Sequence, residues 1–479
     1  MKKGISLKTL LALMALASGV TFSSVQAADS PAAAATLSRE QVENIVRRSY
    51  QYVAMYNVNQ KFALDSSAGA MFMKGFNKPV SMTQLTDHTV RSIARPNNDT
   101  LYQAAVLDLR SDPVIIKFPA IDTKYASLET SGYDHVVAVP LATSRGDFKR
   151  PTNILFYTNR TSAYHGQSVK GVDQIVKVDC DFMIAFLRAM PHQVDPARMA
   201  RIARSLQDSK VLTLSEFQGK PANRPVDPKY PAYGKTDGDV FANNLLEVMQ
   251  FIFNHTTFDP KDPMDQAVLA AYKPLGVIPG KAFDAANVAT IDGAQFREVA
   301  ADVAKQALAS QTNPTVLARV TPQMFMPKGQ FDLETQVLQS VVGPIGLPAY
   351  QARYVPVATK DGKPMDAMHD YVLRMTKEEM PPSTAFWSLT LYDLNDGFFI
   401  PNERKKYSVG ENAGYLPNAD GGIEIYVSAT QPKGVPIENW LPINRENIGI
   451  NGMFRIYAPD PEKSKTWQTP KFETLPSTN

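Results

Sequence analysis

The spacing of apolar residues changes near residue 100, and this change constrains the fold more than any other feature of the chain. Through residues 100–157, apolar and polar residues alternate in short segments that are rich in β-branched and aromatic residues and separated by Pro, Gly, Asp and Ser. A period of two is typical of β-strands, so these segments predict a sheet or sandwich. A helix should precede them, because Ser38 and Gln41 fit a capping box that opens a helical apolar pattern. We assign residues 37–215 to this β-rich N-terminal domain.

The pattern changes again after this domain. Residues 216–345 begin with a long stretch rich in Pro and Gly and continue with segments whose apolar residues recur at helical spacing. Strand character returns in residues 346–465, and residues 466–479 form a tail. The sequence therefore predicts an α+β chain with a β-rich N-terminal domain, a helical middle segment and a C-terminal antiparallel β-sandwich of jelly-roll-like form.

The N-terminus has the pattern of a secretory signal peptide. A positively charged start precedes an apolar run at residues 10–20, and Val25 and Ala27 stand at the −3 and −1 positions of a cleavage site. A transmembrane anchor is the alternative, but the run is short for a span of roughly 20 residues. We therefore expect residues 1–27 to be a signal peptide, residues 28–36 to be a flexible leader, and the mature chain to be exported to the periplasm or secreted.

Charge and cysteine content limit the partners. The chain has 50 Lys and Arg against 47 Asp and Glu, a net charge of +3, and removal of Lys2, Lys3 and Lys8 gives 3 − 3 = 0. A neutral chain without a basic stripe gives no reason to expect nucleic acid, or a membrane after cleavage, as a partner. The single cysteine, Cys180, lies in an apolar run and is expected to be buried and inert. No two histidines have metal-ligand spacing, so we expect no metal and no cofactor.

Two long motifs resemble known families. The segment "NNDTLYQAAVLDLRSDPVIIKFP" and the following "YASLETSGYDHVVAV" resemble the family DUF1254. The segments "AFWSLTLYDLNDGFFIPNERKKYSVG", "NADGGIEIYVS" and "NWLPINRENIGINGMFRIYAP" resemble its partner family, DUF1214. The resemblance implies an exported bacterial protein in which the two domains follow one another in this order, with a β-sandwich at the C-terminus. It implies little about chemistry.

The strongest candidate site is the polar segment at the entrance of the first predicted strand. Asp99 can act as a general base, and Arg95 can bind a carboxylate or phosphate group with two hydrogen bonds. Asn98 and Tyr102 complete a set that we expect to bind substrate. The alternative is a structural turn, since Asn and Asp favour turns by bonding their own backbone.

Other candidates lie elsewhere in the chain. His135 is the second predicted catalytic residue, and we expect it to join Asp99 from a neighbouring strand. Trp387 and Trp440 are candidate substrate-binding residues that would form a wall of a cleft. For Trp387 a place in the core of a strand is the simpler interpretation.

Two functions remain open at this stage. The first is a hydrolase that acts on a small organic substrate in a cleft between the two β-rich domains, because domain interfaces are common ligand sites. The second is a non-catalytic periplasmic protein that binds a small molecule or interacts with a partner. The chain lacks the G-x-S-x-G and P-loop motifs, which argues against an α/β-hydrolase elbow and an ATP enzyme. Whether it is an enzyme, and whether it forms a homo-oligomer, the sequence leaves open.

Overall fold

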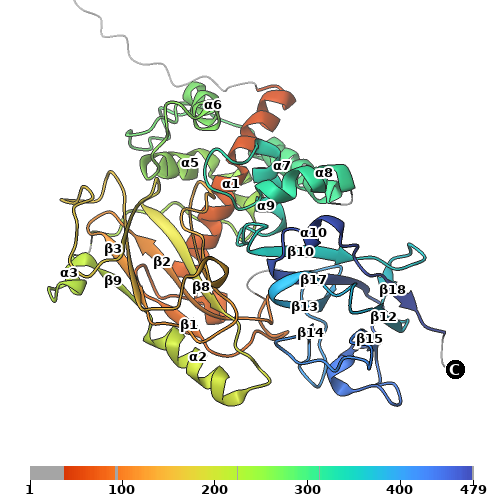
Figure 1. Cartoon of the computed structure of the whole chain (residues 1–479). Coiled ribbons are helices and arrows are strands. Elements are labelled where there is room, and N and C mark those ends of the chain that lie inside the picture. Colours follow the sequence, from red (N-terminus) through yellow and green to blue (C-terminus); the bar gives the residue numbers. More distant parts are fainter. Residues whose placement is uncertain (1–36, 92–94, 224, 312, 477–479) are drawn as a thin grey trace, which may run out of the picture.

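The computed structural model (Figure 1) describes residues 37–91, 95–223, 225–311 and 313–476. Strands from the first half and from the last third of the chain form two separate groups, and helices lie across the top of both in this view. The predicted signal peptide and flexible leader fall outside the described residues. No helix of the described part is long and apolar enough to cross a membrane.

The N-terminal β-rich region contains two sheets that share a core. The first sheet has the order β1 (Val80–Met82), β2 (Leu101–Asp108), β8 (Phe182–Ala189), β4 (Ala126–Gly132) and β5 (Leu141–Ala142). The second has the order β7 (Gln174–Lys177), β6 (Thr152–Tyr157), β3 (Val114–Phe118) and β9 (Lys210–Thr213). Alternate residues such as Leu107, Ile116 and Phe156 fill the space between the sheets. Helix α2 (Pro196–Asp208), with its N-cap at Asp195, packs on this core, and the short α3 (Leu214–Phe217) follows β9.

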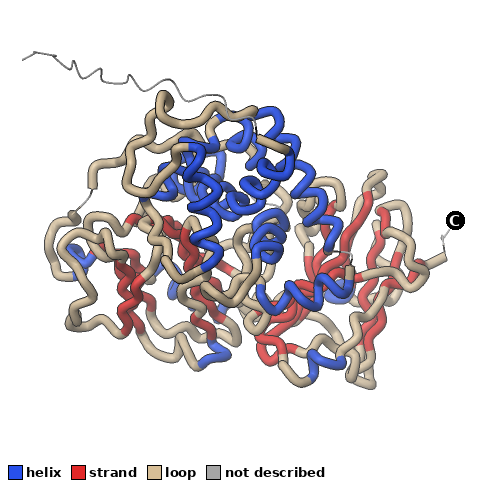
Figure 2. The backbone as a smooth tube through the Cα atoms, turned by 90° about the horizontal axis from the view of Figure 1, so that it is seen from above, coloured by secondary structure: helices blue, strands red, loops and turns tan. Residues whose placement is uncertain are grey.

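A helical layer covers the other face of the first sheet. It comprises α1 (Arg39–Leu64), α4 (Asp237–Asn243), α5 (Leu245–Asn254), α6 (Pro263–Tyr272), α7 (Gly293–Ser310), α8 (Pro314–Val320) and α9 (Leu333–Val342). Figure 2 shows these helices gathered between and above the two groups of strands. The predicted capping box is present, since the Ser38 side chain accepts from the Gln41 backbone while the Gln41 side chain accepts from Ser38.

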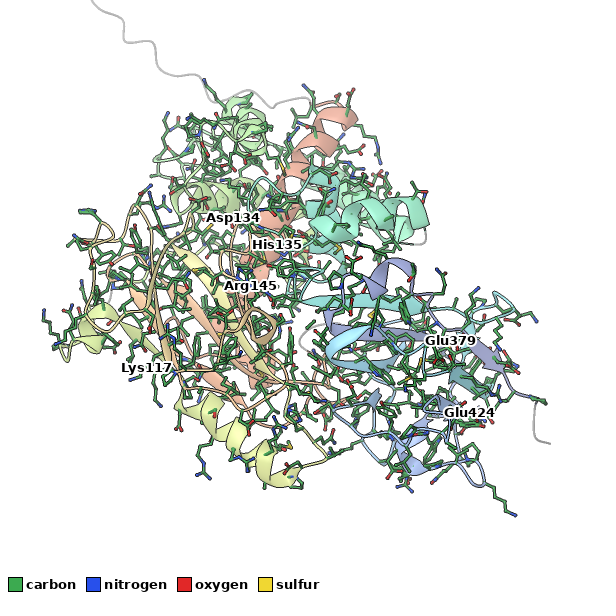
Figure 3. All side chains as sticks on the ribbon, in the orientation of Figure 1. Lys117, Asp134, His135, Arg145, Glu379 and Glu424 are labelled. Carbon is green, nitrogen blue, oxygen red and sulfur yellow. The ribbon has the colours of Figure 1, made fainter. Side chains whose placement is uncertain are left out.

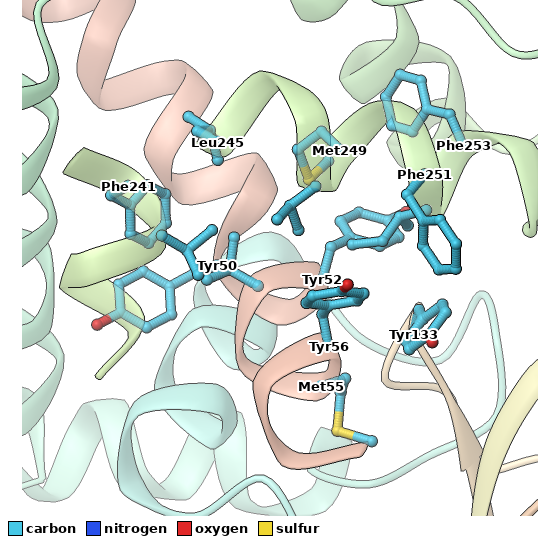
Figure 4. Packing of buried hydrophobic residues seen from close by; sticks show 14 of the residues in the cluster. Tyr50, Tyr52, Met55, Tyr56, Tyr133, Phe241, Leu245, Met249, Phe251 and Phe253 are labelled. Carbon is cyan, nitrogen blue, oxygen red and sulfur yellow. The ribbon is translucent and has the colours of Figure 1, made fainter. Parts of the chain in front are cut away.

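The centre of the helical layer is α1. Its aromatic residues Tyr50, Tyr52 and Tyr56 pack against α4, α5 and the end of β4 (Figure 4). The ring centroids of Tyr56 and Phe251 are 5.7 Å apart, and those of Tyr56 and Tyr133 are also 5.7 Å apart. The first helix therefore depends on partners that come much later in the chain.

The C-terminal region is a β-sandwich. One sheet has the order β10 (Ala352–Val357), β17 (Gly449–Pro459), β13 (Ser383–Asp393) and β14 (Ser408–Gly410), with β11 (Met365–Asp366) also paired to β17. The other has the order β16 (Trp440–Pro442), β15 (Ile423–Ser428), β12 (Tyr371–Met375) and β18 (Phe472–Thr474). The pairs are antiparallel except that β15 and β16 run parallel, and the short α10 (Lys463–Thr466) precedes β18. The α+β class predicted from the sequence is confirmed.

The two β-rich regions touch through an aromatic contact. Tyr125, from the segment before β4, lies 4.9 Å from Tyr457 of β17 between ring centroids. Tyr457 stacks on Phe386 of β13 at 4.1 Å, with the two rings nearly parallel. Leu347 and Met190 complete this small core. The outer face of the β10-β17-β13-β14 sheet is thus turned toward the N-terminal region, and this face positions the candidate site.

Candidate functional site

The first cluster of the site surrounds Asp99, in the loop that enters β2. Oδ2 of its carboxylate accepts hydrogen bonds from the Ser388 hydroxyl at 2.6 Å and from the Tyr457 hydroxyl at 3.1 Å. Ser388 lies on β13 and Tyr457 on β17, which are paired strands. Because alternate residues of a strand point to opposite faces, Trp387 fills the sandwich core while Ser388 and Tyr457 face the N-terminal region. The buried carboxylate therefore joins the two β-rich regions.

The turn before β2 is made by Asn97. Its side-chain oxygen accepts the backbone N–H of Asp99 at 2.6 Å, and its amide nitrogen donates to the Tyr457 hydroxyl at 2.9 Å. Asn98 donates to the carbonyl of Thr86 at 2.5 Å. Asn97 therefore makes the turn and also contacts the C-terminal sheet, while the carboxylate of Asp99 faces that sheet.

Two arginines lie beside this loop. Arg455 of β17 is buried, and its guanidinium donates to Thr390 at 3.2 Å and to the carbonyls of Arg95 and Pro96 at 3.1 and 3.2 Å. Arg95 is half-buried, and its own guanidinium donates to the carbonyl of Val342 at the end of α9, at 3.4 Å. The arginine predicted from the sequence therefore contacts the helical layer, while Arg455 holds the loop in place.

A second polar cluster lies on the first sheet, next to the Asp99 loop. Arg188 of β8 pairs with Tyr102 of β2 on one side and with Ser127 of β4 on the other. Nη1 of Arg188 donates to Oε2 of Glu129 at 2.7 Å, and the two side chains are 5% and 4% exposed. The Arg188 guanidinium lies 5.8 Å from the centroid of the Tyr102 ring. Strand alternation places all four side chains on the face opposite Leu187, which is in the core between the sheets.

The two clusters meet beside Tyr354 of β10. This side chain is 40% exposed, yet burial raises its pKa to about 12, against the opposing charges of Arg188 and Arg455. Tyr354 pairs with Arg455 across β10 and β17, so its side chain lies on the face that is turned toward the N-terminal region. We call the two clusters and Tyr354 the interdomain site.

Several buried polar atoms at the interdomain site have no hydrogen-bond partner among the residues that the structure describes. Native structures leave few such atoms, since most bind protein, ordered water or a ligand. Asp99 Oδ1 and Thr100 Oγ1 lie just before β2, and Arg455 Nε lies within β17. The hydroxyls of Tyr125 and Ser127, at the start of β4, interact with each other. The first three atoms give the site unused donors and acceptors.

The electrostatics of the site favour carboxyl groups that hold a proton more tightly than usual. Burial raises the pKa of Asp99, and the charge of Arg455 opposes this shift. Burial also raises the pKa of Glu129, and the charge of Arg188 opposes that shift. A carboxyl group with a raised pKa and an unpartnered oxygen is suited to proton transfer. Within the described residues, no group of three or more His, Cys, Asp or Glu side chains is placed to hold a metal ion.

His135 lies away from this site. Residue Ala126, at the start of β4, is level with Leu101 at the start of β2, because both pair with Ala189. Asp99 precedes that level and His135 follows the far end of β4, so about 20 Å of strand separates them. Figure 3 shows His135 and the adjacent Asp134 where the sheet meets the helical layer. The expectation that His135 joins Asp99 in one cavity is therefore wrong.

The surroundings of His135 indicate a structural role. Its ring nitrogens lie 2.9 Å from the Ser340 hydroxyl and 2.8 Å from the Pro344 carbonyl, so it ties β4 to the end of α9. Burial lowers its pKa to about 4, and the imidazole is neutral at pH 7. It has a backbone φ of 60°, which an L-residue adopts only when its surroundings require it.

Neither candidate tryptophan faces the interdomain site. Trp387 packs in the sandwich core, with its ring centroid 6.0 Å from that of Phe454. Trp440 lies on the other sheet of the sandwich, where its indole N–H donates to the carbonyl of Ser428 at 3.1 Å and Arg404 covers its ring. The structure therefore brings together Asp99 and Tyr102 from the predicted set, with Asn98 and Arg95 at the edge.

Sequence reasoning missed the two arginines at the centre of the site. Arg188 stands in "FMIAFLRAM" and Arg455 in "GMFRIYAP", each a single charge within an apolar strand. A charged residue in such a strand is rarely buried without a partner. A single arginine within an apolar strand was therefore the signal available in the sequence.

The single cysteine, Cys180, is buried and not in a disulfide, as expected.

The fold and the site define a two-domain α+β protein in which a β-rich domain and a β-sandwich meet at a buried polar interface. Residues 76–213 match the family model of DUF1254, described as a protein of unknown function, and residues 351–461 match that of DUF1214, described in the same way. The chain is a two-domain protein of these two families.

Two solved structures are similar to the chain. The crystal structure of the VPA0106 protein from Vibrio parahaemolyticus has a TM-score of 0.67 and 21% identity, over 91% of this chain and 100% of that one. An uncharacterised protein from Burkholderia cenocepacia has a TM-score of 0.42 and 14% identity, over 91% of this chain and 93% of that one. The first similarity supports the fold alone. The TM-score of the second is too low to support a conclusion. No curated protein matches the chain.

Proposed function

We propose that the chain binds a small organic molecule at the interdomain site. The observation that carries the proposal is the set of three buried polar atoms, Asp99 Oδ1, Thr100 Oγ1 and Arg455 Nε, that have no hydrogen-bond partner among the described residues. Leaving such an atom unpaired costs about 1–3 kcal/mol, so a ligand that pairs several of them gains substantial free energy. Interfaces between domains are also frequent ligand sites. A ligand here would contact both β-rich regions at once.

Hydrolysis of the bound molecule is the second candidate function, and Asp99 supports it. Two hydroxyl groups hold one oxygen of its carboxylate, while the other oxygen has no hydrogen-bond partner in the described part of the chain. As a general base, Asp99 takes a proton from a water molecule whose oxygen attacks an ester or amide carbonyl carbon. The bond to the leaving group then breaks, and the proton passes from Asp99 to the leaving group. A non-catalytic binding protein requires only the contacts.

The substitution Asp99→Asn separates these functions from a purely structural role. The amide keeps the shape of the carboxylate and one acceptor for Ser388 and Tyr457, so the free energy of unfolding should change by no more than about 1 kcal/mol. Hydrolysis should fall by about 100-fold or more, because the amide cannot act as a base. Urea unfolding measures the first quantity. Binding and turnover of a panel of small acids, esters and amides measure the second.

The control for this experiment is Asp361→Asn, which changes an exposed carboxylate in a loop of the sandwich. It should leave binding and turnover unchanged. The non-catalytic function is supported if the unsubstituted protein binds a probe without turning it over and Asp99→Asn loses that binding. Unchanged binding and turnover in Asp99→Asn would exclude the interdomain site as the functional site.

We also propose that the chain is exported and that cleavage after Ala27 removes the signal peptide. The charged start, the short apolar run and the small residues before the cleavage point support this proposal. N-terminal sequencing of the protein recovered from the periplasm or the medium should give Ala28 as the first residue. A first residue within positions 1–20 would contradict the cleavage, and a protein found only inside the cell would contradict export.

A further inference from the structure

We infer that the ligand of the interdomain site is a small organic monocarboxylate, and that Arg188 binds its carboxylate beneath Tyr354. This inference rests on the proposed function, because it names the class of molecule that the same site takes. It is supported by the position of Arg188, the charges around it and the exposure of the nearby tyrosines Tyr102 and Tyr354.

The side chain of Arg188 is preorganised for binding a ligand, because Glu129 fixes its position. A guanidinium has five N–H donors in a planar fork that matches the two oxygens of a carboxylate. Among the described residues, Arg188 donates one hydrogen bond, from Nη1 to Glu129. Glu129 thus fixes the direction of the side chain while using only part of the fork. The neighbours Tyr102 and Ser127, level with Arg188 on the adjacent strands, limit its movement sideways.

The charges of the site favour a single negative charge on the ligand. Arg188 and Arg455 are balanced by Glu129 and Asp99, so the four groups together are close to neutral when all are ionised. A phosphate dianion would bring two negative charges into a buried place that holds no matching excess of positive charge, so a monoanion costs less free energy there.

Two tyrosines mark where the body of the ligand lies. Tyr354 is 40% exposed and Tyr102 is half-buried, and the two residues come from different domains. The charge of Arg188 acts on the Tyr354 phenol, and the charge of Glu129 acts on it more weakly. The Tyr354 hydroxyl can donate to a carboxylate that Arg188 holds, while the two rings offer faces to a planar or apolar body. A carboxylate bound to Arg188 would therefore lie near side chains from both domains.

Matched probes test the chemical class. Benzoate, phenylacetate and hexanoate are titrated calorimetrically into the purified mature protein, each beside its methyl ester, and phenyl phosphate is titrated as the dianion. We expect at least one carboxylate to bind about tenfold or more tightly than its ester and than phenyl phosphate, since a charge-assisted bidentate contact is lost in the ester. An ester or phenyl phosphate that binds as tightly as every carboxylate would overturn the inference while the proposed small-molecule site stands. Failure of all probes to bind would overturn both.

Two variants test the residues. Tyr354→Phe removes one hydroxyl from a partly exposed side chain, so it should fold normally and weaken carboxylate binding about threefold to tenfold. Arg188→Lys keeps the charge beside Glu129 but loses the fork, and should weaken binding about tenfold or more. The control Arg374→Lys changes an exposed ion pair on the far sheet of the sandwich and should change nothing. Carboxylate binding that is unaffected by Tyr354→Phe would show that the carboxylate binds elsewhere, even if Arg188→Lys fails to fold.

Discussion

Replacing Glu129 by methionine is expected to lower the free energy of unfolding by about 3–5 kcal/mol. The substitution leaves the guanidinium of Arg188 buried without its carboxylate partner, which is 2.7 Å away in the native protein. A charge taken out of water needs a partner, and removing one member of a buried pair is among the most damaging single changes. Urea unfolding followed by circular dichroism measures the loss.

Two further variants distinguish the lost pair from lost packing. Glu129→Met combined with Arg188→Met removes both charges and should recover most of the stability, because no unpaired charge remains. Glu424→Met breaks the exposed pair with Arg374, at the outer edge of the sandwich in Figure 3, and should cost less than about 1 kcal/mol. If the double variant were as unstable as Glu129→Met, the ion pair would not be the cause.

The second large effect concerns Asp134, which lies at the far end of β4 from the interdomain site. Burial raises its pKa to about 7, the nearby Asp179 adds to the shift, and Lys328 opposes it. The native state therefore holds this proton more tightly than the unfolded state, whose carboxyl group ionises near pH 4. The contribution of Asp134 is most favourable below about pH 4, is lost progressively as the pH rises to about 7, and changes no further above it.

Asp134→Asn should remove this pH dependence. The asparagine oxygen can still accept the backbone N–H of Val136, which lies 3.2 Å from the carboxylate in the native protein. At pH 8 the variant should be more stable than the unsubstituted protein by about 2–4 kcal/mol. At pH 4 the two should be nearly equal, because the native carboxyl group is then protonated. A difference of equal size at both pH values would show that packing, and not ionisation, is responsible.

The order and type of the elements could be predicted from local patterns. The capping box of α1, the alternating strands and the Pro/Gly-rich stretch are all properties of neighbouring residues, and the α+β class follows from them. The placement of α1 could not be predicted in this way. Its apolar face fits any hydrophobic partner, and only the folded chain shows that it packs on α5 and on the end of β4.

The candidate site was predictable on one side only. Asp99 and Tyr102 stand in a polar segment that is unusual before an apolar strand, so the sequence indicates them. Their partners Ser388 and Tyr457 are 289 and 358 residues away from Asp99, and nothing local connects them. The prediction for His135 was wrong because the sequence does not reveal at which end of the sheet this residue lies. His135 follows β4, which is separated from β2 by β8. The direction of β4 relative to β2 decides that point.

The central position of α1 has a consequence for the order in which the chain folds. Its partners include α9, and residues 65–332 separate the two helices. At about 5–20 residues per second, ribosomes need roughly 13–54 s to synthesise that stretch. Its partners α4 and α5 are made only after residue 236, and α9 is made last, so part of the apolar face of α1 stays without its native cover throughout this time. The newly made N-terminal segment is therefore the part of the chain that a holding chaperone is expected to shield, and shortening the delay should reduce aggregation during expression.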